Sequence, residues 1–532
     1  MTTLTAAKNP APSKNMPITK SPFALTKLLA TIGPASESEA VLTRLIEAGV
    51  TLFRINFSHG TLEDAERRLN AIRTVAEGLN VPIAIIGDLT GPKIRVGLVP
   101  DPGITVDAGD EVEIHATSGY SRADGDRVML TCTYPHIAAE VDTGHRVLIN
   151  DGAIRMLAVD SNGGALICRV TTGGRITSNK GINLPDSDLS VPALTEKDWN
   201  CAEWGVRHKL DFLALSFVRS ARDVIQLRDR LAHLCTPERC GMDLGVDDPA
   251  YIIPVIAKIE TPQAVANIEN ILQQTDAIMV ARGDLGVEMD LARVPVIQKR
   301  LVQAAHDFGK PCIVATQMLE SMIEQPYPTR AEVSDVANAI LDGADCVMLS
   351  GETAVGKYPV LAADTVRRVA LATEEELRQH PQSERPPAKL RESRERVAAL
   401  AHGAWHIARD VDAKIIVVWS QNGATARHLS RNNFQVPVVA FTTDPSATRR
   451  MNLLYGVVPI LVDAIPTHRS DFAEMADRTV LQAGLVKRGD PIVLLGGKPL
   501  GQPGTTNTVA LRYAGELSPG KVLADDNPDN TL

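Results

Sequence analysis

Long hydrophobic runs are absent from this chain of 532 residues, and so is an excess of positive charge. A membrane-spanning helix needs about 18 or more apolar residues in a row, so we predict that the protein does not span a membrane. A formal net charge of -9 argues against a surface that binds nucleic acid broadly. Local clusters of Lys and Arg remain compatible with small phosphorylated ligands.

Cysteine pairs with disulfide or zinc spacing are also absent. The seven cysteines are an odd number, and they show neither CxxC pairs nor neighbouring histidines suited to zinc. Thiols in a reducing compartment fit this pattern. Residues 1–21 contain no acidic residue and no arginine, which favours a disordered N-terminal arm over a transit peptide. We therefore predict a cytoplasmic protein.

A repeated pattern of short apolar runs, each followed by a helical stretch, extends through the first two thirds of the chain. Eight such strands alternating with helices predict an α/β fold of the TIM-barrel type, with its active site at the carboxyl ends of the strands. The predicted strands are Lys27–Ile32, Thr51–Ile55, Ile83–Gly87, Asp211–Phe217, Ile252–Ile259, Asp276–Ala281, Cys312–Thr316 and Asp345–Leu349.

Two further regions interrupt or follow the barrel pattern. Residues 92–181 change to short strands separated by Gly and Asp turns, which predicts an inserted all-β domain. Residues 361–532 contain four apolar strands with helices between them, which predicts a C-terminal α/β domain. The barrel then comprises residues 22–91 and 182–360.

The predicted strand ends carry charged and hydroxyl side chains. The second strand ends in FRINFSHG, which contributes Arg54, Asn56, Ser58 and His59, and the third strand is followed by Asp88, Lys93 and Arg95. Arginine forms a planar fork that suits phosphate oxygens, but a structural ion pair explains Arg54 equally well. Both interpretations stay open at this point.

The fifth and sixth strands add a lysine and two carboxylates. Lys258 and Glu260 are two residues apart and thus share one side of a strand, and Asp284 lies in a predicted glycine-rich turn. Such carboxylates suit a hard divalent cation, whereas Lys258 as a simple counter-ion is the alternative. Thr316 and Ser216 present hydroxyls at the ends of their strands, although Ser216 also fits a local cap.

Nine segments of the sequence resemble pyruvate kinases closely, in the order found in that family. They are ATIGPAS, RINFSHG, DLTGPKIR, KGINLP, AKIE, VARGDLGVE, ATQMLESM, PTRAEVSDVANAILDGAD and LSGETA. The resemblance covers about residues 27 to 358 and continues more weakly through the C-terminal domain. It implies transfer of a phosphoryl group between phosphoenolpyruvate and ADP, giving pyruvate and ATP.

The resemblance also implies roles for individual residues. Arg54 binds the transferring phosphate, Lys258 stabilises charge in the transition state, and Glu260 and Asp284 ligate Mg²⁺ or Mn²⁺. The remaining implied contacts are Ser216, Gly283 and Thr316 with the substrate, and Asn56, His59, Arg95 and Lys180 with the nucleotide. Thr316 is expected to assist protonation of the enolate, and the inserted domain is expected to act as a lid.

One departure from the family pattern concerns a monovalent cation. Family members hold K⁺ near positions that match Asn56, Ser58, Asp88 and Leu89, and the potassium-dependent members have Thr at position 89 and Glu at position 93. This chain has Leu89 and Lys93 instead. The Lys93 ammonium is expected to replace K⁺, so we predict that the protein is active without added K⁺.

The C-terminal domain resembles the regulatory unit of the family. Hydroxyls and backbone N–H groups there are candidates for binding a sugar-phosphate or nucleotide effector, and ordinary turn and cap chemistry is the open alternative. The candidate residues are Ser420, Asn422, Gly423, Thr425, Thr505 and Thr506. The resemblance further implies a homotetramer.

Two other functions compete with the kinase prediction. A barrel lyase or aldolase would use Glu260 and Asp284 to hold a metal-bound pyruvate enolate without a nucleotide site. A metabolite sensor that had lost its chemistry would lack Lys258, Glu260 or Asp284, yet all three are present.

Overall fold

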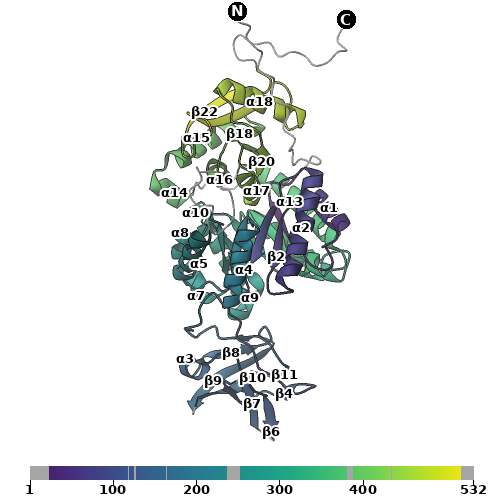
Figure 1. The fold of residues 1–532 in the computed structure, drawn as a ribbon, viewed down its shortest axis with the longest axis vertical. Coiled ribbons are helices and arrows are strands. Elements are labelled where there is room, and N and C mark those ends of the chain that lie inside the picture. The colour runs from purple at the N-terminus through teal and green to yellow at the C-terminus, as the bar shows by residue number, and fades with distance from the viewer. Residues whose placement is uncertain are drawn as a thin grey trace, which may run out of the picture.

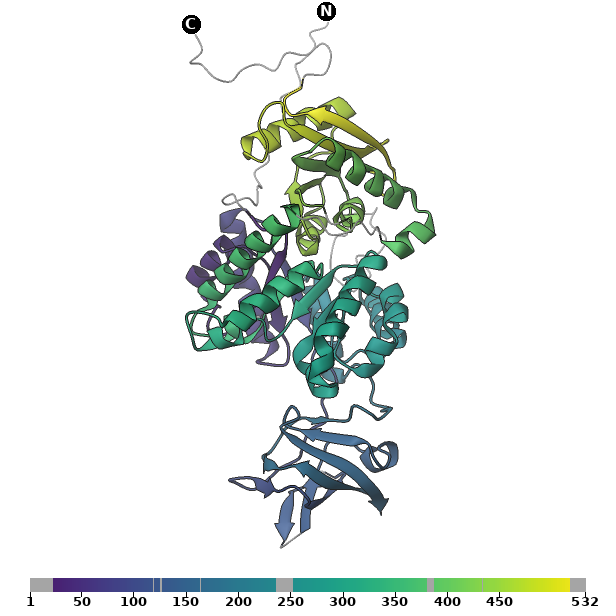
Figure 2. The same cartoon turned by 180° about the vertical axis from the view of Figure 1, so that it is seen from behind.

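The computed structural model describes residues 23–117, 119–124, 127–162, 164–235, 252–379, 387–432 and 434–516. The predicted arm at residues 1–21 lies outside this part of the chain. Figures 1 and 2 show three stacked bodies, with the helix-covered barrel between a small β body and the C-terminal α/β body. The predicted domain boundaries at residues 92, 181 and 361 stay predictions.

A closed barrel of eight parallel strands confirms the predicted fold class. Around the barrel the order is β1-β17-β16-β15-β14-β13-β3-β2. The strands are β1 (Lys27–Thr31), β2 (Val50–Asn56), β3 (Ala84–Asp88), β13 (Phe212–Leu215), β14 (Val255–Ile259), β15 (Ala277–Ala281), β16 (Cys312–Ala315) and β17 (Cys346–Leu349).

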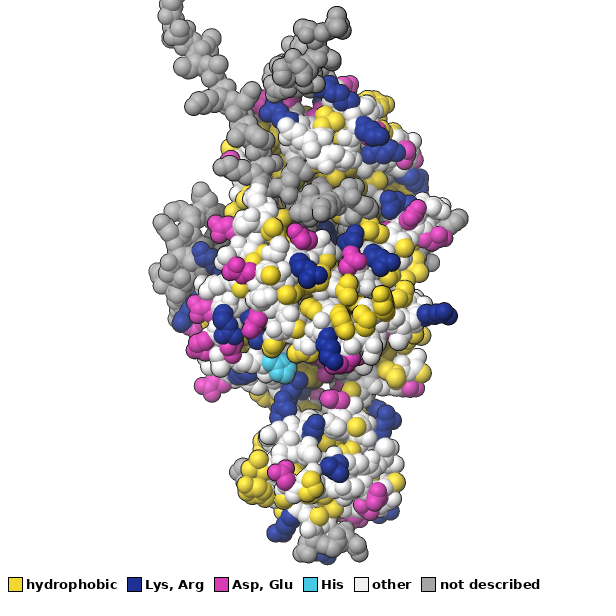
Figure 3. Space-filling view, turned by 90° about the vertical axis from the view of Figure 1, so that its right-hand side faces the viewer, with side chains coloured by type: hydrophobic (Ala, Val, Ile, Leu, Met, Phe, Trp, Pro, Cys, Tyr) yellow, Lys and Arg dark blue, Asp and Glu magenta, His cyan; other side chains and the backbone are white. Residues whose placement is uncertain are grey.

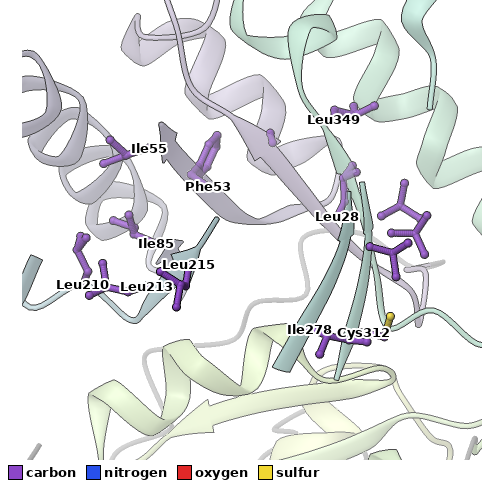
Figure 4. Packing of buried hydrophobic residues seen from close by; sticks show 14 of the residues in the cluster. Leu28, Phe53, Ile55, Ile85, Leu210, Leu213, Leu215, Ile278, Cys312 and Leu349 are labelled. Atoms are coloured by element: carbon purple, nitrogen blue, oxygen red, sulfur yellow. The ribbon is translucent and has the colours of Figure 1, made fainter. Parts of the chain in front are cut away.

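Alternating side chains explain how these strands build two cores. Leu29 and the inward-facing residues of the other barrel strands fill the barrel interior, whereas Leu28 and Ala30 point outwards to the helices. Figure 4 shows part of the outer layer, including Leu213, Leu215 and Ile278. Because both faces of each strand are buried, the strands read as continuous apolar runs.

Helices cover the outside of the barrel. Capping boxes at Thr61, Thr195 and Thr329 begin α2, α4 and α11, which explains where these helices start. The helices between and after the strands are α1 (Glu39–Glu47), α2 (Leu62–Leu79), α4 (Glu196–Arg207), α5 (Ala221–Leu234), α7 (Pro262–Ala266), α8 (Ile268–Gln274), α9 (Arg282–Glu288), α10 (Val294–Asp307), α11 (Arg330–Leu341), α12 (Gly351–Ala354) and α13 (Pro359–Gln379).

The inserted region follows β3 and lies beyond the carboxyl ends of the barrel strands (Figure 1). Its elements are β4 (Ile104–Val106), β5 (Glu111–His115), β6 (Arg122–Asp124), β7 (Arg127–Thr131), α3 (Ile137–Glu140), β8 (Arg146–Ile149), β9 (Ile154–Asn162), β10 (Ala165–Thr172), β11 (Gly174–Ile176) and β12 (Ile182–Asn183). They form a seven-stranded sheet and a two-stranded sheet around a separate core. The all-β prediction missed the one-turn helix α3, because four residues are too few for a helical period to be visible.

The two chain segments that connect the inserted region to the barrel pair with each other. Arg95 forms an antiparallel bridge with Gly181, and the backbone N–H of Val96 donates to the Lys180 carbonyl over 2.8 Å. We call this pair the neck. Figure 3 shows the narrowing there, with Lys and Arg side chains on both sides of it.

The C-terminal sheet has the order β20-β19-β18-β21-β22 and closes the opposite end of the barrel. Leu453 reaches the barrel's inner core, and Lys27 Nζ donates to the Val457 carbonyl over 2.6 Å. The antiparallel edge strand β22 was not predicted, since only Thr506 in it is buried and it forms no continuous apolar run. The elements are α14 (Ala388–Ser393), α15 (Arg396–Asp410), β18 (Ile415–Trp419), α16 (Ala424–Ser430), β19 (Val438–Thr442), α17 (Pro445–Arg450), β20 (Val457–Leu461), α18 (Arg469–Gln482), β21 (Pro491–Gly497) and β22 (Thr506–Tyr513).

In the described part of the chain, no helix has the length and apolar character that crossing a membrane demands.

Candidate active site

A chain of opposite charges runs across the carboxyl-terminal rim of the barrel. Arg54 at the end of β2 donates from Nε to Asp88 Oδ2 over 2.5 Å, and Nη1 donates to Thr31 Oγ1 over 3.1 Å. The other oxygen of Asp88 lies 3.3 Å from Lys258 Nζ. Asp88 is therefore shared by two cations, so Arg54 has the carboxylate partner of a structural ion pair while its guanidinium lies at the rim.

Lys258 connects this ion pair to a second carboxylate. Its Nζ lies 3.0 Å from Glu260 Oε1 and donates to Ser216 Oγ over 2.7 Å. Ser216 in turn donates to the Leu89 carbonyl over 2.7 Å. The structure thus brings four residues to one place: Arg54 of β2, Lys258 of β14, Glu260 directly after β14, and Ser216 in the turn after β13.

Burial and charge oppose each other in this cluster. Burial alone would lower the pKa of Lys258, but Asp88 and Glu260 outweigh it and raise that pKa, so the ammonium stays charged. Burial would raise the pKa of Asp88, but Arg54 and Lys258 lower it below its ordinary value. Burial raises the pKa of Glu260, with help from Asp284 and against the attraction of Lys258.

The two oxygens of Glu260 have different partners. Its Oε2 accepts the Phe217 backbone N–H over 2.6 Å, while Oε1 faces Lys258 and accepts no hydrogen bond from the described residues. Asp284 is half-buried and close enough to raise the pKa of Glu260. A buried carboxylate oxygen without a hydrogen bond beside a second carboxylate fits a hard divalent cation.

Asp284 does not lie in a turn, as the glycines around it predicted. It occupies the first turn of α9, which starts directly after β15. The glycines misled the prediction because glycine disfavours a helix only weakly, and an acidic residue in the first turn is stabilised by the helix dipole.

Thr316 is held in a fixed position after β16. Its Oγ1 accepts the Gly283 backbone N–H over 2.7 Å and donates to the Ala315 carbonyl over 2.6 Å, and its φ is 69°. Arg282 fixes it from behind: Nη2 donates to the Thr316 carbonyl over 2.8 Å, and Nη1 lies 2.7 Å from Asp335. Sequence reasoning missed Arg282 and Asp335, although Arg282 directly follows an apolar strand.

A cavity of about 430 Å³ opens between the barrel rim and the neck. Lys93, Arg95, Lys180 and Asp284 all line it, which gathers three predicted cations around one predicted metal ligand. Arg95 Nη1 donates to the Asn179 carbonyl over 2.8 Å. With Arg219, the lining holds four cations against the three acids Asp151, Asp284 and Glu288, a small excess of positive charge for an anionic ligand.

Asn56 ends β2 and His59 follows it, close to the charges of Arg54 and Lys93. Burial lowers the pKa of His59, and the nearby Lys93 and Arg54 lower it further. The Asn56 side chain accepts the Ser58 backbone N–H over 3.0 Å. Lys93 is therefore close to the rim charges, and its Nζ lies 6.0 Å from the Phe217 ring centre.

The loop that carries Leu89 and Lys93 is fixed by a residue that sequence reasoning missed. Asp198 is fully buried, and its Oδ1 accepts the backbone N–H groups of Thr90 over 2.8 Å and Gly91 over 3.2 Å. Leu89 is itself 1% exposed and packs in the core. No position along the sequence links Asp198 to this loop, so only the fold reveals it.

The predicted effector residues form two groups in the C-terminal region. Thr425 and Thr506 meet with their hydroxyl oxygens 2.8 Å apart, and Ser420 Oγ accepts the Ala426 N–H over 3.1 Å. Thr505 donates to its own loop, and Asn422 accepts the Ala424 N–H next to Gly423, whose φ is 83°. The contacts of Ser420, Asn422 and Thr505 are those that cap and turn chemistry predicts, whereas the contact between Thr425 and Thr506 joins distant parts of the chain; an effector remains a proposal.

Fold and rim together define a class of protein: a barrel enzyme with cations and carboxylates gathered at the carboxyl ends of its strands. Two family models match the chain, "Pyruvate kinase, barrel domain" at residues 23–363 and "Pyruvate kinase, alpha/beta domain" at residues 398–511. The chain belongs to the pyruvate kinase family, whose members are transferases.

Individual relatives agree with this assignment. A pyruvate kinase of Mycobacterium intracellulare is 38% identical over 491 residues, which cover 92% of this chain and 98% of that protein. One from Thermotoga maritima is 36% identical over 484 residues, which cover 91% and 98%. A crystal structure of a pyruvate kinase from Cryptosporidium parvum matches with a TM-score of 0.81 at 30% identity, covering 92% of this chain and 96% of that one.

Pyruvate kinases bind phosphoenolpyruvate and ADP and generally use Mg²⁺.

Proposed function

We propose that this chain transfers the phosphoryl group of phosphoenolpyruvate to ADP, with the rim residues in the roles that their positions favour. The main support is the buried chain from Arg54 through Asp88 to Lys258 and Glu260. In the transition state, negative charge is delocalised over the oxygens of the transferring phosphoryl group. Fixed cations in a poorly solvated cleft stabilise this charge.

Arg54 and Lys258 bind the phosphate oxygens and stabilise their charge. Asp88 holds both cations in place, and the Ser216 hydroxyl orients the Lys258 ammonium. Gly283 and Thr316 position the substrate, and Thr316 assists protonation of the enolate carbon. Arg282 keeps Thr316 in that position through the carbonyl contact.

Glu260 and Asp284 would hold Mg²⁺, which would neutralise negative charge on the substrate. The nucleotide enters by the cavity at the neck. Arg95 and Lys180 contact its phosphates from the neck, and Asn56 and His59 contact it from the barrel. Closing of the inserted region excludes water from the reacting phosphate.

Substitution of Lys258 by Met tests the proposed chemistry. The change removes one fixed cation from the transition state, so kcat should fall by about 100- to 1,000-fold. A coupled assay of pyruvate formation from phosphoenolpyruvate and ADP measures it. The matched control is Lys414→Met, since Lys414 is an exposed lysine paired with Asp412. Wild-type turnover in Lys258→Met would refute the role.

The same assay separates the kinase from a lyase or aldolase. A kinase forms ATP only when ADP is present, whereas an enzyme that only holds a pyruvate enolate needs no nucleotide. Turnover of a pyruvate-derived substrate at an undiminished rate without ADP would favour that alternative.

We further propose that the enzyme needs no K⁺. Lys93 lies near Arg54 and His59, and its ammonium supplies a positive charge at the rim. A second cation about 4 Å away would be repelled by about 4 kcal/mol at an effective dielectric constant of 20. Leu89 also offers no hydroxyl for a cation at the matching position.

The variant Lys93→Glu tests this proposal. The wild type should be active in buffer free of K⁺, while Lys93→Glu should lose that activity and regain part of it when K⁺ is added. The control Lys197→Glu makes the same charge change near His59 at a residue outside the loop that carries Leu89 and Lys93. A strict K⁺ requirement of the wild type would overturn the proposal.

Regulation, assembly and location complete the proposal. A phosphorylated metabolite binds between Thr425, Thr506 and the neighbouring turns, and the protein works as a cytoplasmic homotetramer. Activity measured with candidate sugar phosphates and nucleotides tests the effector. The variant Thr425→Val, which lacks one of the proposed binding hydroxyls, is compared with the wild type in the same assay. Sedimentation at assay concentration tests the tetramer.

A further inference from the structure

Two histidines on α15 face each other, far from the barrel rim. His402 and His406 are one helical turn apart, and their Nε2 atoms lie 3.2 Å from each other. Side chains at i and i+4 share one face of a helix, which brings the two rings together. The ring centres are 4.6 Å apart, and the ring planes cross at 81°.

We propose that His402 and His406 bind a first-row transition-metal dication, with Cu²⁺ preferred. Metal-bound imidazole nitrogens lie about 2.0–2.1 Å from the ion, so two of them on one ion are separated by about 3.3 Å at a tetrahedral angle and about 2.9 Å at a right angle. The observed 3.2 Å falls inside this range. The separation of the two nitrogens therefore already matches chelation, and a bound metal would replace the hydrogen bond that now joins them.

The donor set selects the kind of metal. Two neutral imidazoles suit Cu²⁺, Ni²⁺ and Zn²⁺, and Cu²⁺ binds most tightly in the Irving–Williams order. Mg²⁺ prefers oxygen ligands and would not compete. The described residues contain no group of three or more His, Cys, Asp and Glu side chains arranged for a metal. The site thus offers two protein ligands and leaves the other positions to water.

The location leaves the pair within reach of solvent. The buried face of α15 consists of small residues, Ala401, Ala404 and Ala408, which pack on the C-terminal sheet. Both histidines are half-buried on the other side, and α15 lies on the outer flank of that sheet in Figures 1 and 2.

Trp405 provides a direct readout. Its ring centre lies 4.9 Å from that of His406 and 6.3 Å from that of His402. Bound Cu²⁺ quenches the fluorescence of an indole at such short range. Titration of the full-length protein with CuCl₂ in saturating Mg²⁺ should therefore quench Trp405 with one equivalent of copper, and Trp405→Phe should abolish that change.

Variants test which residues hold the ion. His402→Gln and His406→Gln should each raise the copper concentration for half-quenching by about 100-fold, because the second imidazole binds as an intramolecular step. His233→Gln, at an exposed histidine of α5, should change nothing. Basal turnover without copper should stay at the wild-type level in all three variants, which also shows that they fold.

A spectrum of the wild type tests the site without any substitution. Electron paramagnetic resonance of the copper-loaded protein should show coupling to two imidazole nitrogens. Wild-type quenching in either His402→Gln or His406→Gln, or a copper signal without nitrogen coupling, would overturn the proposal.

Discussion

Substitution of Arg431 by Met should destabilise the junction between the C-terminal region and the base of the barrel. Arg431 directly follows α16, and Asp345 directly precedes β17. Arg431 Nη1 donates to Asp345 Oδ2 over 2.7 Å. The arginine side chain is 4% exposed and the aspartate side chain 2%. The change therefore leaves a buried carboxylate without its cation.

The expected size follows from what remains around Asp345. The carboxylate keeps the backbone N–H groups of Cys312 at 2.9 Å and Tyr455 at 3.2 Å but loses its only charged partner among the described residues. Breaking a buried pair from one side costs about 3–5 kcal/mol of folding free energy. For domains of this size that corresponds to a fall of about 10 °C in the unfolding midpoint.

Thermal unfolding followed by circular dichroism measures the effect. Lys414→Met breaks an exposed pair with Asp412 and should cost about 1 kcal/mol or less. The double variant Arg431→Met with Asp345→Asn removes the stranded charge and should recover part of the loss. A loss below 1 kcal/mol in Arg431→Met, or a greater loss in the double variant, would refute the reasoning.

Two further predictions concern buried polar groups. Burial, with help from Arg427, lowers the pKa of His428 to about 4, so the folded state binds fewer protons than the unfolded state between pH 6.5 and 4. Stability should thus fall by about 3 kcal/mol as pH drops through this window, and urea unfolding should show a shallower loss in His428→Gln. Asp198→Ala strands the N–H groups of Thr90 and Gly91 and should lower the free energy of unfolding by about 1–3 kcal/mol; a value indistinguishable from wild type in urea titration would contradict this.

The barrel was predictable because its strands are buried on both faces. Such strands appear as continuous apolar runs, and the rule that active sites follow the strand ends then points to Arg54, Lys258 and Glu260. The ends themselves were less predictable. Ser216 and Thr316 lie one residue beyond the strands that were expected to include them.

Long-range polar contacts could not be predicted. Asp88 is flanked by Arg54 and Lys258, which come from strands far apart in the sequence, and no local pattern encodes that partnership. The same holds for Arg282 behind Thr316. These contacts depend on how elements pack, whereas residue patterns report mainly on each element alone.

The neck has a consequence for how the molecule comes apart. The chain leaves the barrel and returns to it beside the same bridge, Arg95 to Gly181. The inserted region between these two points has a hydrophobic core of its own. That module can melt as an independent cooperative unit while the eight-stranded ring stays closed. Heating curves should accordingly contain more than one step, and a protease acting early should nick the protruding sheet and spare the rest.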